Sequence, residues 1–386
     1  MAVKQNAFWQ CFFTLFTILS SFSGATAEDN TPGTLGTPPQ TKFVLPRMIN
    51  LRGFDYGAQT NGQYTPNANL AMPPPDSQVP HFLAQNVNFF RVPVAWEYLQ
   101  PEMNGKLNEV NLKTYRTFIE KFARYKGQIV GESSFTPASA LVSLWSQLGG
   151  VFKDNPLVMF GLSKEPHDLG KTSLVSSNSP PCADNRVSTP CDSKDITKWA
   201  ITVQAVVTKL RTDKIENILL IPGADYTPIK TFPEWYNAMK VVKNPDGSFE
   251  KLIFEAHRYL DSDNSGKSPE CSGADEVSKA VEPLKPGGRQ IPLAETGGGN
   301  TASCMKLLPE LAQAVTEAYP VFGGFALWAV GSLDEKSELV TTVRAASSPT
   351  GWKDLGNWIS IAQFTPPKGS EKAGKSTKST HQWEAK

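Results

Sequence analysis

The chain has 386 residues, of which 38 are lysine or arginine and 37 are aspartate or glutamate, so its formal net charge at pH 7 is +1. This balance, with no long basic stripe along the body, argues against nucleic acid as a partner. Lysines gather only in the last segment, residues 366–386, which has few apolar residues and is expected to be a disordered, solvated tail.

The first 27 residues have the pattern of a secretory signal peptide. Lys4 precedes an apolar run of about a dozen residues, and the segment ends in the small residues Ala25-Thr26-Ala27. A membrane anchor is the competing interpretation, but the run is too short for a span of roughly 20 residues. We therefore expect a secreted, extracellular protein with no membrane attachment after cleavage. Residues 28–45, rich in Pro, Gly and Thr, are expected to form a flexible N-terminal segment.

Residues 46–365 are expected to form one domain, since a single (β/α)8 barrel typically takes about 250 residues plus insertions. Short, continuous apolar runs that suit strands buried on both faces alternate here with longer amphipathic segments. In chain order the runs are MINLRGF, VNFFRVPV, LVMFGLS, ILLIPG, LIFEAHRY, IPLAETG and GGFALWAV. The alternation predicts parallel strands with covering helices, and therefore a TIM barrel.

Only seven strong strand runs are present, and the missing one should lie between VNFFRVPV and LVMFGLS. The sole candidate, GQIVG, follows the helical segment EVNLKTYRTFIEKFARYKG almost directly. The third strand is therefore expected to be truncated. Either GQIVG and its neighbours close the barrel, or coding sequence has been lost, which would expose an unpaired strand edge.

Removal of the signal peptide also removes Cys11, and the remaining cysteines are Cys182, Cys191, Cys271 and Cys304. In an oxidising compartment this count fits two disulfides. Three pairings are possible, and proximity favours Cys182–Cys191, within a Pro/Ser/Thr-rich loop insert at residues 170–194, and Cys271–Cys304. A zinc site is the alternative, but no Cys-x-x-Cys spacing or histidine pair supports it.

Polar or aromatic groups stand at strand ends, where a barrel places its chemistry. They are Arg91, Glu165, His257, Tyr259, Glu295 and, as a flat apolar face, Trp328. Singly, an arginine here could be a structural ion pair, a histidine a core residue and a tryptophan ordinary packing. Together, two carboxylates, a cation and aromatic rings at one rim meet the requirements of sugar hydrolysis, in which two acids flank the scissile bond.

The chain resembles glycoside hydrolase family 5, and within it the fungal endo-β-1,4-glucanases, nearly from end to end. The matching segments are NLRGFDYGAQTNG, NFFRVPVAWEYLQPEMNGKLNEVNLKTY, SLWSQL, FGLSKEPHD, IFEAHRYLDSDNSGKSPEC, ETGGGNTASC and LWAVGS. The Glu-Pro pair alone is a weak motif, whereas AHRYLDSDNSG together with AETGGGN is highly specific.

The resemblance implies hydrolysis of internal β-1,4-glucosidic bonds in cellulose or a related β-glucan, with mannan as another candidate substrate. Glu165 would be the acid/base and Glu295 the nucleophile of a retaining, two-step reaction, their carboxyl groups about 5 to 5.5 Å apart. Proton transfer and carboxylate attack suffice, so no metal or cofactor is expected, and the protein is expected to be a monomer. The residues implied in substrate binding are Arg91, His257, Tyr259 and Trp328.

Two departures from the family pattern favour an alternative, a catalytically weak or inactive glucan-binding pseudoenzyme. The family has asparagine, which bonds the sugar 2-hydroxyl, where this chain has Lys164; lysine can only donate, and its charge would lower the pKa of the neighbouring acid. The family also supplies a histidine from the end of the third strand, and no residue here matches it. The intact Glu295 and its TGGGN context favour the enzyme.

Overall fold

The computed structural model describes residues 45–57, 65, 73–85, 87, 89–121, 126–132, 138–167, 196–273, 277–286 and 288–362. The expected signal peptide, nearly all of the N-terminal segment, the loop insert at 170–194 with Cys182–Cys191, and the lysine-rich tail lie outside these residues. In the described part of the chain, no helix is both long and apolar enough to span a membrane.

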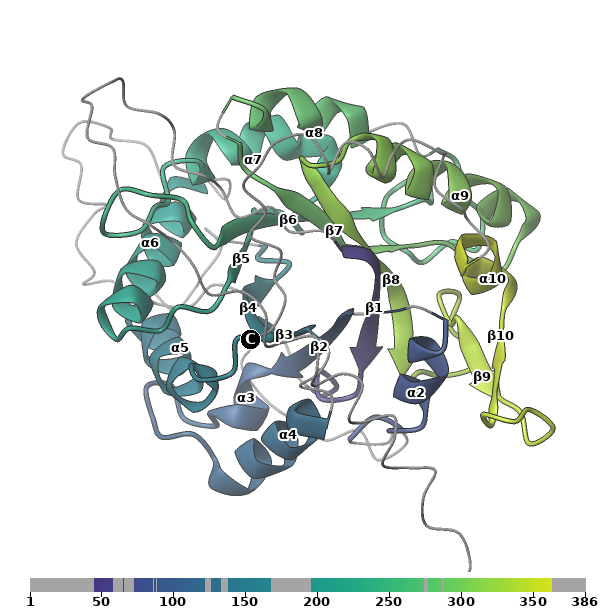
Figure 1. The fold of residues 1–386 in the computed structure, drawn as a ribbon, viewed down its shortest axis with the longest axis horizontal. Helices are drawn as coiled ribbons and strands as arrows, with labels where there is room; N and C mark the ends of the chain where they lie inside the picture. Colours follow the sequence, from purple (N-terminus) through teal and green to yellow (C-terminus); the bar gives the residue numbers. More distant parts are fainter. Residues whose placement is uncertain are drawn as a thin grey trace, which may run out of the picture. The chain divides into compact units, whose positions relative to one another are not determined.

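Eight parallel strands close into a barrel in sequence order (Figure 1). They are β1 (Leu45–Arg52), β2 (Phe89–Ala95), β3 (Lys126–Glu132), β4 (Val158–Lys164), β5 (Leu219–Pro222), β6 (Leu252–Tyr259), β7 (Ile291–Gly297) and β8 (Phe322–Gly331). β8 pairs in parallel with β1, which completes the ring. The closed ring confirms the predicted TIM barrel. Its strands are buried apolar runs, which need helices on one face and packed side chains on the other.

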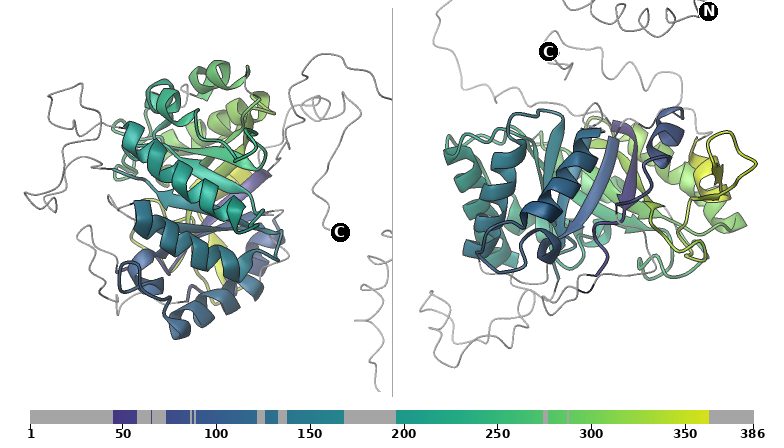
Figure 2. Two further views of the ribbon diagram at one scale, coloured as in Figure 1. Left: turned by 90° about the vertical axis from the view of Figure 1, so that its left-hand side faces the viewer. Right: turned by 90° about the horizontal axis from the view of Figure 1, so that it is seen from below.

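Helices surround the barrel on its outer side (Figures 1 and 2). They are α2 (Gln78–Leu83), α3 (Trp96–Leu99), α4 (Glu109–Lys121), α5 (Ala138–Phe152), α6 (Ile196–Thr212), α7 (Phe232–Met239), α8 (Val277–Leu284), α9 (Ala302–Glu317) and α10 (Gly356–Ala362), with a 3-10 turn, η1 (Ile229–Thr231). A two-stranded antiparallel hairpin, β9 (Thr342–Arg344) with β10 (Trp352–Asp354), follows β8. On α6 the side chains of Val203, Val206 and Val207 are fully buried, as its 3.6-residue apolar stripe requires.

The third strand is complete as a barrel element, which corrects the expected truncation. β3 pairs with β2 over all seven residues, from Lys126 opposite Phe89 to Glu132 opposite Ala95, and also pairs with β4. The sequence is short in the connection instead, because α4 ends at Lys121 and β3 begins at Lys126. A parallel ladder uses backbone groups, so GQIVG and its neighbours can close the ring despite their low apolar content. The five residues after β3 lie outside the described residues.

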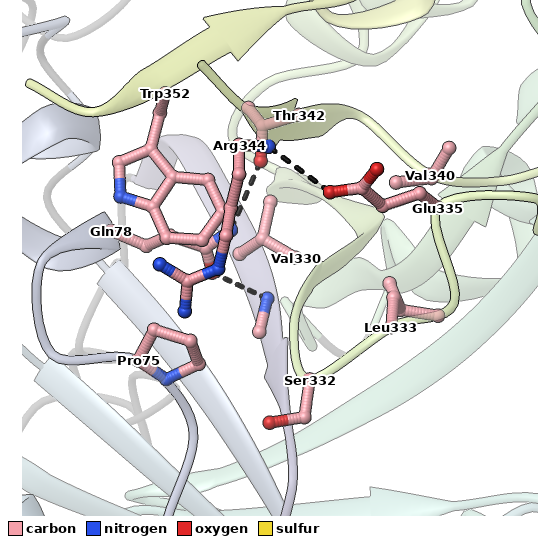
Figure 3. A pocket seen from close by; sticks show the side chains of 11 residues that line it. Pro75, Gln78, Val330, Ser332, Leu333, Glu335, Val340, Thr342, Arg344 and Trp352 are labelled. Carbon is pink, nitrogen blue, oxygen red and sulfur yellow. Dashed lines mark hydrogen bonds between the residues drawn. The ribbon is translucent and has the colours of Figure 1, made fainter. Parts of the chain in front are cut away.

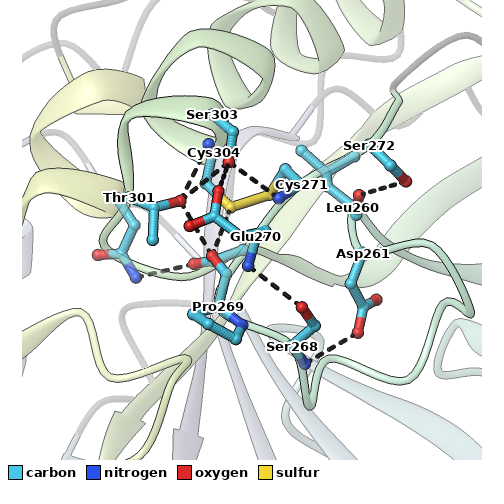
Figure 4. The surroundings of a disulfide bond; sticks show 12 residues. Leu260, Asp261, Ser268, Pro269, Glu270, Cys271, Ser272, Thr301, Ser303 and Cys304 are labelled. Atoms are coloured by element: carbon cyan, nitrogen blue, oxygen red, sulfur yellow. Dashed lines mark hydrogen bonds between the residues drawn. A yellow bond between two sulfur atoms is a disulfide. The ribbon is translucent and has the colours of Figure 1, made fainter.

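One predicted disulfide is confirmed: Cys271 and Cys304 are bonded, with an S–S distance of 2.02 Å. The bond joins the loop after β6 to the first turn of α9 (Figure 4). Around it, Ser303 accepts from the backbone N–H of Cys271 and donates to Glu270. Thr301 caps α9 by accepting from the N–H of Cys304. The disulfide therefore holds the loop that follows β6 against the start of α9, the helix that follows β7.

Removing this disulfide in a Cys271→Ser/Cys304→Ser variant is expected to lower the free energy of unfolding. The bond closes a loop of 33 residues, for which the chain-entropy relation gives about 3 to 4 kcal/mol. Guanidinium-induced unfolding at constant pH, followed by tryptophan fluorescence, measures the change. As the control, wild type and variant are also compared in reducing buffer, where neither has a disulfide and both should unfold at the same denaturant concentration. Equal midpoints for the two proteins under oxidising conditions would contradict the prediction.

Candidate active site

The structure brings all the predicted site residues together at the C-terminal end of the barrel. Arg91 lies on β2, His257 and Tyr259 on β6, Glu295 on β7 and Trp328 on β8. Lys164 is the last residue of β4, and Glu165 follows it. The convergence follows from barrel closure, since the carboxyl ends of parallel strands share one rim.

Glu295 accepts hydrogen bonds from two donors, one on each carboxylate oxygen. The Arg91 guanidinium Nη1 donates to Glu295 Oε1, and the Tyr259 hydroxyl donates to Oε2 at 2.8 Å. Glu295 is only 1% exposed and Arg91 is fully buried. A buried guanidinium and a phenol therefore fix the orientation of the Glu295 carboxylate, one donor on each oxygen.

The donors to Glu295 stay protonated. Burial, reinforced by the charge of Glu295, raises the pKa of Tyr259 well above its usual value, so Tyr259 remains a phenol that can donate. Burial opposes the charge of Arg91, but the nearby carboxylates, Glu295 and Glu255 foremost, together outweigh it and raise the pKa of the guanidinium. Arg91 is oriented in turn by Asn50, whose Oδ1 accepts from Nη1 at 3.0 Å while its Nδ2 donates to the carbonyl of Ala294.

Glu165 lies across the site from Glu295, with His257 between them. The His257 Nδ1 is 2.8 Å from Glu165 Oε1 and 3.8 Å from Glu295 Oε2. Glu165 keeps 21% of its side chain exposed, which leaves it accessible to a substrate. Its φ of +47° is uncommon for a residue other than glycine, and such strain gathers at functional sites. One ligand oxygen or nitrogen from each of Glu165, His257 and Glu295 lies within 4.8 Å of the others.

Lys164 lies between the two carboxylates. Its Nζ is 3.3 Å from Glu165 Oε2 and 3.9 Å from Glu295 Oε1, and it stands 4.8 Å from the centre of the Trp328 ring. Burial raises the pKa of Glu165, but the charge of Lys164 and the hydrogen bond from His257 outweigh it and hold this pKa well below its usual value. At rest, therefore, Glu165 is a carboxylate rather than a protonated acid.

Two further groups at the rim were missed by the sequence reasoning. Arg52, at the end of β1, places its guanidinium over both Trp328 and Tyr56, 4.8 and 4.2 Å from the ring centres. Tyr226, after β5, is 51% exposed and stacks on His167, with ring centres 4.3 Å apart and planes at 12°. The sequence could have indicated them as a polar residue that ends a strand, in LRGF, and an aromatic residue in the loop after a strand, in PGADY.

The donor set of Glu165, His257 and Glu295 resembles in kind one that binds a divalent metal, with one imidazole and two carboxylates. In this chain two cations already contact those carboxylates: Arg91 contacts Glu295, and Lys164 lies within 4 Å of both. A metal ion there would meet strong like-charge repulsion. The residues therefore do not fit a resident metal ion.

Comparison with known proteins agrees with the fold. The family model "Cellulase (glycosyl hydrolase family 5)" matches residues 55–331. The manganese dependent endoglucanase Eg5A of Phanerodontia chrysosporium is 32% identical over 346 residues, covering 84% of this chain and 82% of that protein. Endoglucanase EG-II of Hypocrea jecorina is 32% identical over 339 residues, covering 79% of this chain and 74% of that protein.

Among solved structures, Cel5A (EG2) from Hypocrea jecorina superimposes with a TM-score of 0.68 at 27% identity, covering 82% of this chain and 97% of that one. The region that the family model matches contains every residue of the site described above except Asn50 and Arg52, which lie just before it. The chain therefore belongs to glycosyl hydrolase family 5, the cellulase family.

Proposed function

We propose that this protein is a secreted endo-β-1,4-glucanase that cleaves internal bonds of cellulose or a related β-glucan with retention of configuration. The observation that carries the proposal is the separation of the two carboxyl groups, which present oxygens within 4.8 Å of each other. Retaining enzymes place their carboxyls about 5 to 5.5 Å apart, whereas inverting enzymes need roughly 6.5 to 9.5 Å to admit a water. Export rests on the signal pattern of residues 1–27.

In the first step Glu295 attacks the anomeric carbon while Glu165, in the small fraction of molecules in which it is protonated, gives its proton to the glycosidic oxygen. The bond between Glu295 and the sugar forms, the bond to the leaving sugar breaks, and Glu165 is left as a carboxylate. In the second step Glu165 takes a proton from water, whose oxygen attacks the same carbon and releases Glu295. Arg91 and Tyr259 stabilise the charge of Glu295 before attack and after release.

Aromatic faces flank the reacting bond on both sides. Trp328 lies beside Lys164 and offers a ring on which the sugar attached to Glu295 can stack. Tyr226, exposed and supported by His167, lies on the side of Glu165 and offers a ring for the leaving sugar. His167 Nδ1 is 2.7 Å from the Glu165 carbonyl, so this ring pair is coupled to the backbone of the acid.

A second candidate, a glucan-binding pseudoenzyme, is favoured by one observation. Lys164 contacts both carboxylates and keeps the pKa of Glu165 low, which leaves little of the protonated acid at neutral pH. In that case the cleft would bind glucan without cutting it. Two observations argue against a pseudoenzyme. Glu295 accepts from both Arg91 and Tyr259, and the Arg91–Glu295 pair is buried; a binding protein needs neither.

The test is hydrolysis of carboxymethylcellulose, barley glucan and mannan by the purified mature protein, with Glu295→Ala as the control. We expect new reducing ends from at least one β-1,4-glucan, and NMR of the fresh product should show the β anomer first. Reducing ends no higher than those of Glu295→Ala would sink the enzyme assignment and leave the pseudoenzyme; an α anomer as first product would refute retention.

The variant Lys164→Asn is expected to be active at higher pH than wild type. Glu165 must be protonated to act as an acid, and the lysine charge lowers its pKa, so activity is lost as pH rises through that low value. Removing the cation raises the pKa and moves the alkaline limb of the kcat/KM profile upward by about one unit or more. Turnover near pH 6 should rise about tenfold.

Lys164→Arg is the matched control for this prediction because it keeps the charge. Its alkaline limb should remain at the wild-type position. If Lys164→Asn and Lys164→Arg share one pH profile, the charge of Lys164 does not set the state of Glu165. If the asparagine variant gains rate equally at every pH, a contact to the sugar hydroxyl, rather than the pKa, is what the lysine lacks.

A further inference from the structure

Glu255 is a carboxylate in the interior of the barrel that the two-step reaction described above does not use. It lies on β6 and is fully buried. Its Oε1 is 3.8 Å from Nη2 of Arg91, which lies on β2. Since β2 and β6 stand across the eight-stranded ring from each other, the approach of these two side chains crosses the interior of the barrel.

Arg91 therefore lies between two carboxylates, Glu295 and Glu255. Its Nη1 donates to Glu295, whereas its Nη2 faces Glu255 at a distance too long for a hydrogen bond. Among the described residues, no acceptor is hydrogen-bonded to Nη2. Glu255 thus acts on Arg91 through its charge, and it does not compete for the donor that Glu295 uses.

The first step of the proposed reaction changes the charge beside Arg91. At rest Arg91, Glu255 and Glu295, here called the Arg91 group, carry one positive and two negative charges. A lone pair of Glu295 then forms the bond to the sugar, and the electron pair of the glycosidic bond passes to the leaving oxygen, which takes the proton of Glu165. Glu295 becomes an uncharged ester, so Glu255 is the remaining carboxylate of the Arg91 group.

A buried guanidinium that loses its counter-charge is destabilised, because water cannot replace the lost partner. With Glu255 charged, the Arg91 group becomes neutral when the ester forms. With an uncharged residue at this position, the same step would turn a neutral ion pair into an uncompensated buried cation. The charge of Glu255 therefore favours the ester and opposes the return of the Glu295 carboxylate.

We propose that Glu255 is a positioning residue that sets the balance between the two steps of hydrolysis. Acting through Arg91, its charge speeds formation of the glycosyl ester on Glu295 and slows hydrolysis of that ester. The inference rests on the proposed glucanase function and deepens it, since it assigns a regulator of the same nucleophile.

The test measures each step separately in Glu255→Gln, which removes the charge and keeps the size of the side chain. A 2-deoxy-2-fluoro β-cellobioside with an activated aryl leaving group forms the ester and releases it slowly, so intact-protein mass spectrometry follows both rates. In Glu255→Gln we expect labelling roughly 10-fold slower and reactivation roughly 5-fold faster than in wild type. On the aryl β-cellobioside without fluorine, kcat/KM should fall while kcat does not.

Two further variants serve as controls. Glu255→Asp keeps the charge and should recover most of the wild-type ratio of the two rates. Glu335→Gln removes one negative charge from the loop after β8, outside the Arg91 group, and should keep both wild-type rates. Glu335 lines a small cavity beside the β9–β10 hairpin, where it accepts from the backbone N–H of Arg344 (Figure 3).

Two results would overturn the inference. Equal slowing of labelling and reactivation in Glu255→Gln would mean that Glu255 only supports the fold, and two unchanged rates would mean that its charge does not act on Glu295. If Glu255→Gln does not fold, Glu255→Met removes the same charge without a buried amide and must show the same opposite shifts. Failure of the proposed function is distinguishable, because the wild-type protein would then take up no label and release no reducing ends from β-glucan; the inference would fall with it.

Discussion

Replacing Glu295 with glutamine is expected to reduce kcat on β-glucan by about 10⁴-fold or more, the scale seen when an enzyme loses its nucleophile. The amide cannot form the glycosyl ester. Its one oxygen can still accept from Arg91, while its nitrogen can donate to the hydroxyl of Tyr259, which in wild type donates to the carboxylate. The barrel end should therefore remain folded, and steady-state hydrolysis of carboxymethylcellulose measures the loss of chemistry alone.

The identity of the nucleophile can be tested with Glu295→Ala, an activated aryl β-cellobioside and added azide. Azide should enter the space left by the carboxylate and attack the face that Glu295 attacks, giving the α-glycosyl azide. The unfolding midpoint of each variant checks that Arg91, fully buried and now without its carboxylate partner, has not destabilised the fold. Formation of the β-glycosyl azide by this variant would assign the nucleophile to another residue.

The site could be predicted from the sequence because its residues lie near the ends of strands that are recognisable as continuous apolar runs. Glu295 and Arg91 are 204 positions apart, and His257 and Glu165 are 92 apart, so no local pattern contains their contact. Once a closed parallel barrel is inferred, all strand ends must meet at one rim. Barrel closure therefore predicts that the polar strand-end residues form one site, and the family resemblance predicts the role of each.

Other features could not be predicted for physical reasons. In β3 only Ile129 and Val130 are strongly apolar, so periodicity could not show that the strand spans seven residues and pairs on both sides. The role of Asn50 depends on its contact with Arg91 on the neighbouring strand. The exposed ring of Tyr226 depends on a run of positive φ angles from Asp225 to Thr227, which the sequence PGADYT does not announce.

Lys164 shows how structure sharpens a sequence anomaly. In the sequence Lys164 is simply the residue before Glu165, so its charge can be argued to affect only that one carboxyl group. In the structure the ammonium group lies near both carboxylates and the face of Trp328. It therefore acts at once on the proposed acid, the proposed nucleophile and the ring proposed to stack on the sugar. When Glu295 becomes an uncharged ester, its repulsion of the Glu165 carboxylate disappears, which favours Glu165 as the base of the second step.

Replacing Glu165 with alanine should separate the two steps of the reaction. On β-glucan, where the leaving sugar needs a proton, we expect kcat/KM to fall about 10² to 10⁴-fold. On an activated aryl β-cellobioside, whose leaving group needs no proton, kcat/KM should change little, because Glu295 keeps its contacts with Arg91 and Tyr259. Stopped-flow measurement should show a burst of phenolate followed by slow turnover, since water then lacks its base.

Azide is again the discriminating reagent, and the matched control is Glu295→Ala. In Glu165→Ala, azide should attack the glycosyl ester from the side that water uses, accelerate turnover and give the β-glycosyl azide, the opposite anomer from that of Glu295→Ala. Opposite anomers from the two variants would assign both roles at once. An equal loss on glucan and aryl substrate, without a burst or azide rescue, would mean that Glu165 is not the acid/base.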